Sequence, residues 1–450
     1  MIWTSAEVRD ALELPAGEGA GLRYAGVSTD TRTLQPGALF VAIRGERFDG
    51  HAHLAEAAAR GAPGAVVEAG TPRVEGLEYF EVSDTVAALG LLARRRRRGI
   101  SGPVVAVTGT NGKTSTKEML AAALRTRFRV HATRANLNNL IGVPLTILEA
   151  PDDTEALVIE AGASVPGEIG QYRKIIEPTV AVVTNVSAGH LEGFGSLDGV
   201  LAEKLSLVDG VPLAVVGTEP PELTAGARRL ARRVVTAGLD GAELKPRSVT
   251  LDTAGRATVA TDQGRFTLPL PGRHLAANAM LAWAVALHLG LDPLAVGRAL
   301  ELLEVPGGRG QVMDLGGLTI LNDCYNANPL SFRAAIATAQ AMRGDRRLVF
   351  VAGTMRELGA EAPALHAAVA RELVALRPEL LGAVGEFAPA LEAHRAELGD
   401  RLVTAPDVTA LGVALASRLA GDELVVLKAS RGVALERIIP LLTPRVAPGS

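Results

Sequence analysis

The sequence predicts an α/β protein divided into three domains, and three observations support this prediction. The chain has 450 residues, which is too long for one ordinary hydrophobic core and corresponds to about three domains. Short runs of apolar and β-branched residues alternate with segments of helical periodicity. Breaks rich in glycine and proline interrupt this alternation at residues 99–103 and 305–310. We therefore expect domains at residues 1–100, 101–308 and 309–450.

Composition and charge exclude several functional classes. Hydrophobic residues make up 48% of the chain, as in a globular protein, and the net charge of −3 gives no general basis for binding nucleic acid or an anionic membrane. The N-terminal residues lack the apolar core of a secretory signal, and no apolar run approaches the ~18 residues that cross a bilayer. Cys324 is the single cysteine and cannot form an internal disulfide. We expect a soluble cytoplasmic protein without membrane insertion.

The first domain is predicted to be a small α/β unit. Two helical patterns and two strand-like runs alternate in it, at Ser5–Leu12, Ala38–Ile43, His53–Arg60 and Ala65–Val67. The polar loops at residues 27–32 and 44–51 adjoin strands, where binding groups are often displayed. Simple solvated loops are the alternative interpretation.

Five consecutive arginines, Arg94–Arg98, end the helix before the first break. No aromatic residues are interleaved with them, so a nucleic-acid-binding patch is not supported. Positive charge in a last helical turn complements the helix dipole. We expect a solvated last turn that leads into the linker Gly99–Pro103.

The second domain begins with the strongest motif of the chain. Val104–Thr108 is typical of a buried strand, and the turn Gly109–Gly112 leads into a helix with apolar residues at helical spacing. Inward-facing N–H groups and the helix N-terminus bind polyphosphates, so Lys113 would reach the β- and γ-phosphates and the Thr114 hydroxyl would face Mg²⁺. Val107 stands where the usual pattern has its first glycine, which leaves an ordinary glycine-rich turn as the alternative.

Polar residues follow the next strands of this domain, which we expect to form a largely parallel sheet covered on both faces. The strand candidates are Ala156–Glu160, Thr179–Thr184 and Leu213–Val216. Glu160, Asn185 and His190 lie at the carboxyl ends of the first two, where ligands gather in open α/β sheets. A metal or catalytic role and an ordinary surface role both remain open. Asn138, in the turn 136–139, is either a substrate contact or part of a simple loop.

The remaining elements complete the second and third domains. Short strands and turns are predicted over residues 247–270, followed by one helix at His274–Leu289 and another that ends near Leu303. The third domain is predicted to be a second doubly wound, Rossmann-like sheet, with strands near residues 318–321, 348–352, 383–384, 401–404 and 424–428. Its first strand leads into Asn322–Pro329, which is either a turn or a nucleoside-binding edge.

Lysine is rare in this chain. Only six of the 46 basic residues are lysines, so a lysine can mark a position that needs a compact primary amine rather than a planar guanidinium. Chance accounts for some of the six. Lys113 is of interest because it belongs to the phosphate-loop motif, and Lys204 because it follows the strand that leads to His190.

Taken together and in this order, the motifs resemble the Mur ligases, which build the peptide of bacterial cell walls. The resemblance covers the whole chain and rests on these segments: Thr108–Lys117, Glu160, Thr184–Asn185 with His190, Lys204 and Asn322–Pro329. Val27–Ile43 resembles the uridine-binding segment that two members of the family share. Tyr325–Pro329 and Met355–Gly359 point to the final member, which joins D-Ala-D-Ala to UDP-N-acetylmuramoyl-tripeptide.

The resemblance implies a UDP-sugar-binding first domain, a central ATP-binding domain and a mobile C-terminal ligase domain. It implies an ATP-dependent ligase in which the peptide carboxylate attacks the γ-phosphate, and the amine of D-Ala-D-Ala displaces the acyl phosphate that results. Such a reaction needs charge neutralisation more than covalent catalysis by the protein. The implied cofactors are ATP and two Mg²⁺ ions, and we expect a monomer.

The resemblance also assigns site residues. Nucleotide binding is assigned to the phosphate loop and to four later residues: Thr108, Gly109, Thr110, Asn111, Gly112, Lys113, Thr114, Ser115, Asn278, Arg309, Asp323 and Asn326. Lys113 is assigned to catalysis, and four residues to the metal site: Thr114, Glu160, His190 and Lys204. The last three are also assigned to catalysis, with Lys204 as a CO₂-derived carbamate, because a carbamate supplies the oxygen ligands that Mg²⁺ prefers. Substrate contacts are assigned to Ser28, Asp49, His51, Asn138, Lys428, Ser430 and Arg431.

Departures and alternatives accompany this interpretation. Thr354, Ala429 and Leu275 stand where the family usually has Asp, Gly and Asn, which concerns details of the closed state. Lys204 could instead be an exposed helix lysine paired with Glu203 or Asp209. The alternatives in function are the preceding ligase, which adds the third amino acid, a folylpolyglutamate-synthase-like ligase, or a nucleotide-driven switch or transport ATPase. The identity of the third residue of the tripeptide is not encoded in any motif.

Overall fold

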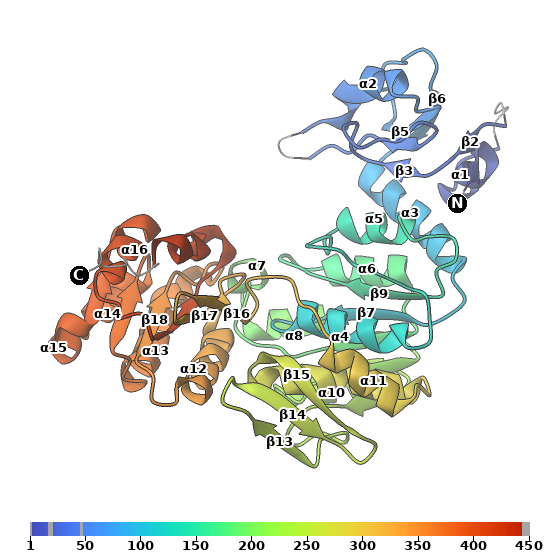
Figure 1. The fold of residues 1–450 in the computed structure, drawn as a ribbon. Helices are drawn as coiled ribbons and strands as arrows, with labels where there is room; N and C mark the ends of the chain where they lie inside the picture. The colour runs from blue at the N-terminus through green and yellow to red at the C-terminus, as the bar shows by residue number, and fades with distance from the viewer. Residues whose placement is uncertain (1, 17–20, 46–47, 443–450) are drawn as a thin grey trace.

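The structure, a computed structural model, describes residues 2–16, 21–45 and 48–442. Residues 46 and 47 of the polar loop 44–51 therefore lie outside the described residues. An N-terminal unit, a central unit and a C-terminal unit follow one another along the chain, and the central one lies between the other two (Figure 1). Their sheets are separate from one another. The predicted α/β class is confirmed.

The N-terminal unit has a parallel four-stranded sheet in the order β3-β4-β5-β6. Its strands are β3 (Val27–Ser28), β4 (Leu39–Val41), β5 (Gly64–Glu68) and β6 (Glu78–Val82), and a small antiparallel pair is formed by β1 (Trp3–Thr4) and β2 (Arg23–Tyr24). The helices are α1 (Ser5–Ala11), the 3₁₀ turn η1 (Gly50–His53) and α2 (Leu54–Ala59). Helix α1 begins with a capping box in which Thr4 and Glu7 satisfy each other's backbone N–H groups. Both predicted helices and both predicted strands are present.

Helix α3 (Thr85–Arg98) connects the N-terminal and central units. Its residues Leu89 and Leu92 belong to the N-terminal core, whereas Ala93 belongs to a core of the central unit. It packs against α5 (Gly142–Leu148) and α6 (Glu168–Ile176) of the central unit. The helix is therefore shared by two cores.

The predicted solvated last turn of α3 holds for Arg95 and Arg98, which are exposed, but is wrong for Arg96 and Arg97. Arg96 is only 4% exposed and donates to the carbonyls of Ala150 and Pro151 at 2.8 and 2.9 Å. Arg97 donates to the carbonyls of Ile176 and Glu177. Ile176 and Glu177 end α6, where a helix leaves carbonyl groups unsatisfied, and Ala150 and Pro151 lie just beyond the end of α5. Guanidinium groups hydrogen-bond these helix ends, so tertiary contacts rather than solvent hold most of the arginine row.

The central unit is built on a six-stranded parallel sheet in the order β12-β11-β10-β7-β9-β8. The strands are β7 (Val104–Thr108), β8 (Val130–Ala132), β9 (Ala156–Glu160), β10 (Val180–Val183), β11 (Leu213–Val216) and β12 (Val234–Thr236). Along β7, Val105 and Val107 enter one core while Val104 and Ala106 enter the other, as the pleat requires. Both faces of the sheet are therefore covered, as predicted.

Helices and a second small sheet complete the central unit. The helices not yet named are α4 (Lys113–Arg125), α7 (Leu191–Phe194), α8 (Leu197–Leu205), α9 (Pro221–Leu230), α10 (Arg273–His288) and α11 (Pro293–Glu301). An antiparallel sheet of β13 (Ser248–Leu251), β14 (Arg256–Ala260) and β15 (Arg265–Pro271) packs on α10 and α11. Phe266 stacks on Trp283 there, with ring centroids 5.2 Å apart.

The C-terminal unit has a second six-stranded sheet, in the order β16-β17-β21-β18-β19-β20. Its strands are β16 (Gln311–Leu315), β17 (Leu318–Asp323), β18 (Leu348–Ala352), β19 (Leu380–Ala383), β20 (Leu402–Thr404) and β21 (Leu424–Lys428). All pairs are parallel except β16 with β17. Strand β16 was not predicted, because its side chains are mostly exposed and give no apolar run.

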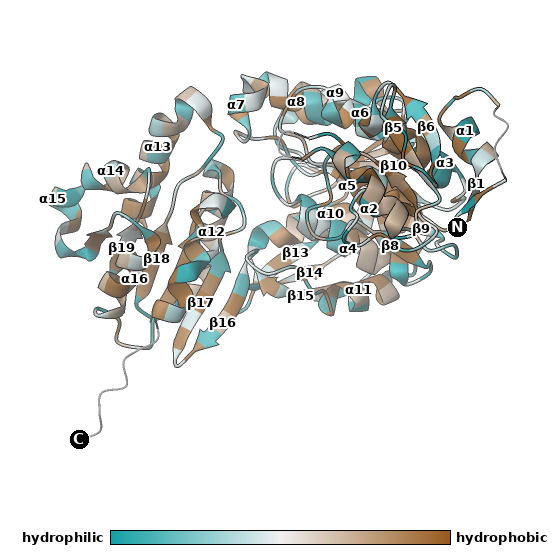
Figure 2. Ribbon diagram, turned by 90° about the horizontal axis from the view of Figure 1, so that it is seen from above, coloured by the Kyte–Doolittle hydropathy of each residue, from teal (hydrophilic) through white to brown (hydrophobic). Residues whose placement is uncertain are grey.

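Helices cover this sheet on both faces. They are α12 (Pro329–Arg343), α13 (Ala362–Ala375), α14 (Phe387–Glu392), α15 (Arg395–Leu398) and α16 (Val408–Ala416), with 3₁₀ turns η2 (Gly359–Glu361), η3 (Gly399–Arg401), η4 (Arg431–Val433) and η5 (Leu435–Leu441). Apolar residues concentrate in the strands, and polar residues are frequent on the outer helices (Figure 2). Within the described part of the chain, no helix is long and apolar enough to span a bilayer.

Candidate functional site

A cleft of about 650 Å³ is lined by residues of the central unit and of the C-terminal unit. The carboxyl ends of β7, β9 and β10 meet there with those of β17 and β21, as expected for ligand sites in open α/β sheets. The following predicted site residues line it: Thr110, Asn111, Gly112, Lys113, Thr114, Ser115, Asn138, Glu160, His190, Asn278, Arg309, Asp323, Asn326 and Lys428. The cleft therefore gathers predicted residues from segments more than 300 positions apart.

Two glycines let the phosphate loop approach its neighbours closely. Gly109 and Gly112 have φ angles of +144° and +78°. A Cβ on Gly112 would lie 2.7 Å from the side-chain amide of Asn278, which is buried on α10. A Cβ on Gly109 would overlap the Thr184 hydroxyl. Both positions thus require glycine in conformation and in space.

We expect Gly112→Ala to reduce nucleotide affinity at least tenfold, because the new methyl group must displace Asn278 from the loop. Gly210→Ala is the matched control, since Gly210 has a φ of +72° but nothing within 4 Å of the position that a methyl group would take. The control carries only the left-handed backbone strain of roughly 1–2 kcal/mol. Calorimetric titration with ADP measures both variants, and equal affinities would contradict the steric argument.

The end of β10 holds the phosphate loop in place. The backbone N–H of Thr110 donates to the Asn185 carbonyl at 2.9 Å, and that of Asn111 donates to Asn185 Oδ1 at 3.1 Å. The Thr184 hydroxyl donates to the Asn111 carbonyl at 2.5 Å. The expected approach of Asn185 to the phosphate loop is therefore present.

Lys113 folds back over its own loop. Its Nζ donates to the carbonyls of Gly109 and Thr110 at 2.9 and 3.2 Å. Loss of solvent contact lowers the pKa of the Lys113 ammonium, and Arg309 lowers it further, while Glu160 acts in the opposite direction. The two hydrogen bonds thus hold the Lys113 amine at the loop, where a polyphosphate would meet it.

Glu160 is a buried carboxylate at the end of a central strand. It ends β9, is 2% exposed, and accepts a hydrogen bond from Asn138 Nδ2 on Oε1 at 2.9 Å. Its Oε2 is buried without a hydrogen-bond partner in the described part of the protein. A buried, unpaired carboxylate oxygen is costly unless a cation or donor joins it. This oxygen therefore fits a metal ligand, and Asn138 fits a residue that orients it.

His190 lies beside a carboxylate of the C-terminal unit. Its Nδ1 is 2.5 Å from Oε2 of Glu357, and the imidazole lowers the pKa of the Glu357 carboxyl. Glu357 belongs to the Met355–Gly359 segment but was not predicted as a site residue. Contact at Nδ1 leaves Nε2 of His190 available for another partner. Among the described residues, no three His, Cys, Asp or Glu side chains form a ready metal-ligand cluster.

Lys204 is a buried lysine of the central unit. It is 1% exposed on α8, its Nζ lies 5.3 Å from the Phe194 ring centroid, and it has no hydrogen-bond or ion-pair partner within the described residues. Burial, and then the charge of Lys113, lower its pKa to about 7. A large fraction of this amine is therefore neutral near pH 7, the form that reacts as a nucleophile.

The alternative of an exposed, paired Lys204 is wrong. Glu203 instead accepts from the backbone N–H groups of Gly167 and Ile169 at 2.7 and 2.6 Å, at the start of α6. Asp209 pairs with Arg173. Both carboxylates are thus committed elsewhere.

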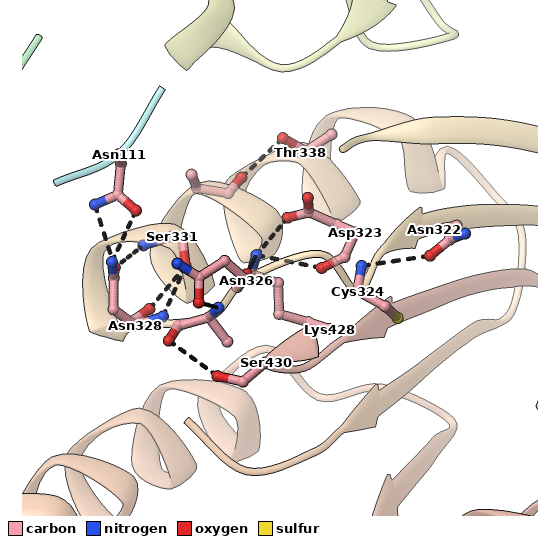
Figure 3. A network of polar contacts seen from close by, with 12 residues as sticks. Asn111, Asn322, Asp323, Cys324, Asn326, Asn328, Ser331, Thr338, Lys428 and Ser430 are labelled. Carbon is pink, nitrogen blue, oxygen red and sulfur yellow. Dashed lines mark hydrogen bonds and ion pairs between the residues drawn. The ribbon is translucent and has the colours of Figure 1, made fainter. Parts of the chain in front are cut away.

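In the C-terminal unit, Lys428 shapes the loop that follows β17 (Figure 3). It is 2% exposed, and its Nζ lies 2.7 Å from Asp323 Oδ2 and donates to the Asn326 carbonyl at 2.7 Å. Ser430 donates to the Ala327 carbonyl at 3.5 Å. The predicted substrate contacts Lys428 and Ser430 therefore also organise the loop that carries Asp323 and Asn326.

Arg309 stacks on the ring of Tyr325, which belongs to a motif of the sequence but was not predicted as a site residue. Its guanidinium carbon lies 3.6 Å from the ring centroid of Tyr325, and the second guanidinium near this ring is that of the predicted residue Arg431, at 5.7 Å. The Arg309 Nε is buried without a hydrogen-bond partner in the described structure. Both Arg309 and Tyr325 line the cleft, so a cation and a ring face are available there together.

The remaining predicted residues lie outside the lining of the cleft. Thr108 is buried at the end of β7, Gly109 begins the phosphate loop, and Lys204 is buried on α8. In the N-terminal unit, Ser28 donates to the Asp30 carbonyl, and Asp49 accepts from His51 at 2.7 Å. His51 Nε2 in turn accepts from the Glu68 N–H at 3.0 Å. Asp49 and His51 thus support the local loop, and their role in substrate binding stays a prediction.

Comparison with known proteins decides the family. Residues 23–141 match the Mur ligase family catalytic domain, residues 107–286 the Mur ligase middle domain, and residues 308–431 the Mur ligase glutamate ligase domain. The chain belongs to the Mur ligase family. A curated relative of this Mur ligase, UDP-N-acetylmuramoyl-tripeptide--D-alanyl-D-alanine ligase of Escherichia coli, is 36% identical over 94% of this chain and 95% of its own.

Solved structures of Mur ligases share the complete architecture. The crystal structure of MurF from Acinetobacter baumannii matches with a TM-score of 0.88 and 29% identity, covering 98% of this chain and 99% of its own. MurF ligase from Thermotoga maritima in complex with ADP matches with a TM-score of 0.81 and 29% identity, covering 93% and 97%. The three-unit arrangement of this Mur ligase is therefore that of its structural relatives.

Proposed function

We propose that this Mur ligase joins D-Ala-D-Ala to UDP-N-acetylmuramoyl-tripeptide at the expense of ATP, through an acyl phosphate, in the synthesis of cell-wall peptidoglycan. The observation that carries the proposal is the cleft in which Lys113 and Glu160 of the central unit face Asp323 and Lys428 of the C-terminal unit. The named activity of the Escherichia coli relative and the ADP complex of the Thermotoga maritima relative support it.

The chain's residues would take distinct parts in this reaction. The backbone N–H groups at the start of α4, which have no acceptor within the helix, would bind the polyphosphate, and Lys113 places a positive charge where the γ-phosphate is transferred. The Asn278 amide lies against Gly112, and Asp323 and Asn326 would provide polar groups for the nucleoside. We propose domains at residues 1–100, 101–308 and 309–450, with a hinge between the second and third near Gly308. Closure of the cleft about this hinge would bring the peptide carboxylate to the phosphate.

Mg²⁺ fits the donors on one side of the cleft. Glu160 Oε2 is buried without a partner in the described structure, and Thr114 lines the cleft at the helix start, while His190 Nε2 is left available by the Glu357 contact. When bound, Mg²⁺ supplies charge neutralisation at the phosphates. We propose in addition that the Lys204 amine adds CO₂ and loses a proton, which gives a carbamate with two oxygen donors.

We expect ADP release only when ATP, a UDP-N-acetylmuramoyl-peptide and D-Ala-D-Ala are all present. The requirement follows because the amine must displace the acyl phosphate before the enzyme turns over. Coupled measurement of ADP with a panel of UDP-muramyl peptides tests it and identifies the preferred third residue. ADP release without either co-substrate would favour a switch or transport ATPase. ADP release with a UDP-muramyl dipeptide and a single amino acid would favour the preceding ligase. Release with a folate and glutamate would favour a folylpolyglutamate-synthase-like enzyme.

A further inference from the structure

A reciprocal pair of asparagine side chains joins the phosphate loop to the C-terminal unit (Figure 3). Asn328 Nδ2 donates to Asn111 Oδ1 at 2.8 Å, and Asn111 Nδ2 donates to Asn328 Oδ1 at 3.3 Å. The two residues are 217 positions apart, and Asn328 is only 4% exposed. Loss of the Asn111 amide would leave the buried Asn328 amide partly unsatisfied.

Asn328 is held in a fixed orientation by its own unit. It is the N-cap of α12, where its side chain accepts from the Ser331 N–H at 2.9 Å and its backbone N–H donates to the Ser331 hydroxyl at 2.9 Å. The loop before it is held by Lys428 through the Asn326 carbonyl. The Asn328 amide therefore moves together with the whole C-terminal unit.

Asn111 is equally well held on the other side. Its side chain donates to the Ser187 hydroxyl at 3.1 Å, and its carbonyl accepts from Thr184. Gly189 allows the close approach, because a Cβ there would lie 2.6 Å from Thr110 and 3.5 Å from Asn328 Nδ2. Asn111 directly precedes Gly112 and Lys113, so a displacement of its backbone moves the groups that meet the phosphates.

We propose that Asn328 is a positioning residue for the reaction: through Asn111 it sets the productive geometry of the phosphate loop when the C-terminal unit is docked. The proposal rests on the proposed function. The His190–Glu357 contact crosses the same junction and gives the docked unit a second point of attachment. Nucleotide can then bind to the central unit alone, but phosphoryl transfer proceeds efficiently only after docking.

Asn328→Ser tests this inference, because serine keeps the helix cap but is too short to reach Asn111. We expect the kcat of the full-length enzyme to fall about tenfold, on the scale of losing a pair of neutral hydrogen bonds, with ADP affinity within twofold of the parent. Asp407→Ser is the matched control, since Asp407 caps α16 in the same unit by accepting from the Ala410 N–H. An unchanged kcat in Asn328→Ser, or an equal fall in the control, would overturn the proposal.

A double-mutant cycle with Asn111→Ser separates a coupled pair from two independent nucleotide contacts. If the pair acts as a unit, the double variant is no slower than the slower single variant. Multiplication of the two effects would refute the coupling. Should the parent enzyme fail to release ADP with its proposed substrates, the proposed function fails instead. The pair is then judged by hydrogen exchange at residues 109–113, which Asn328→Ser should accelerate and which an absence of coupling would leave unchanged.

Discussion

Lys113→Ala abolishes ligation while leaving the fold intact: this is the largest effect that we expect from a single substitution. The ammonium lies over the phosphate loop, held by two of its carbonyls. Removal of one preorganised electrostatic group typically raises a barrier by about 3 kcal/mol, and a full charge at the transferred phosphoryl group contributes at least as much. Lys113→Arg should fail as well, because a planar guanidinium does not replace a compact ammonium in this loop.

The measurement is ADP release with saturating substrates, together with the midpoint of thermal unfolding. Lys174→Ala on α6 is the control, because Lys174 is exposed and its substitution removes the same charge from the chain. Near-normal turnover of Lys113→Ala would show that the phosphate-loop assignment is wrong. An unfolded variant would not test it, so the unfolding midpoint must stay close to that of the parent.

Lys204→Ala is expected to give the second largest loss, with recovery when a short-chain carboxylate such as formate or acetate is added. The buried amine has no polar partner in the described structure and lies near the charge of Lys113, which opposes its protonation. Conversion to a carbamate replaces this repulsion with attraction between opposite charges. A small carboxylate could occupy the place of the carbamate in the alanine variant and restore part of the activity.

The test compares Lys204→Ala with Lys245→Ala, an exposed lysine of the same unit. Activity is measured with and without formate, and a ¹³C signal of a carbamate is sought in the parent enzyme under labelled bicarbonate. Full activity of Lys204→Ala without additive would eliminate the hypothesis. A carbamate signal that disappears in Lys204→Ala but remains in Lys245→Ala would identify the modified nitrogen.

The central part of the site could be predicted because its signals are local. The strand, the glycine turn and the helix around Lys113 follow one another directly, and a parallel sheet necessarily brings Glu160 and Asn185 to the same edge. The burial of Lys204 could not be read from its helix, because the residues that surround it, such as Phe194, come from other elements.

The contacts across the junction of units were outside the reach of sequence patterns. Asn328 looks like an ordinary helix cap in sequence, and only the fold places Asn111 against its amide. Glu357 similarly becomes relevant only because its loop meets His190. Arg96 and Arg97 were misread because the helix-dipole argument is local, whereas in the folded chain their guanidinium groups hydrogen-bond carbonyls at the ends of α5 and α6.

The way α3 ends has a consequence for how this protein could be cut or recombined. The Glu177 carboxylate, at the end of α6, accepts hydrogen bonds from both Arg94 and Arg98. These contacts, that of Arg98 above all, lower the pKa of the Glu177 carboxyl to about 2. A fragment that starts at residue 101 would lose these partners and uncover Ala93's neighbours in the central core. The boundary for exchanging N-terminal units between related enzymes therefore lies before Asp84, the N-cap of α3, so that the helix stays with the central unit.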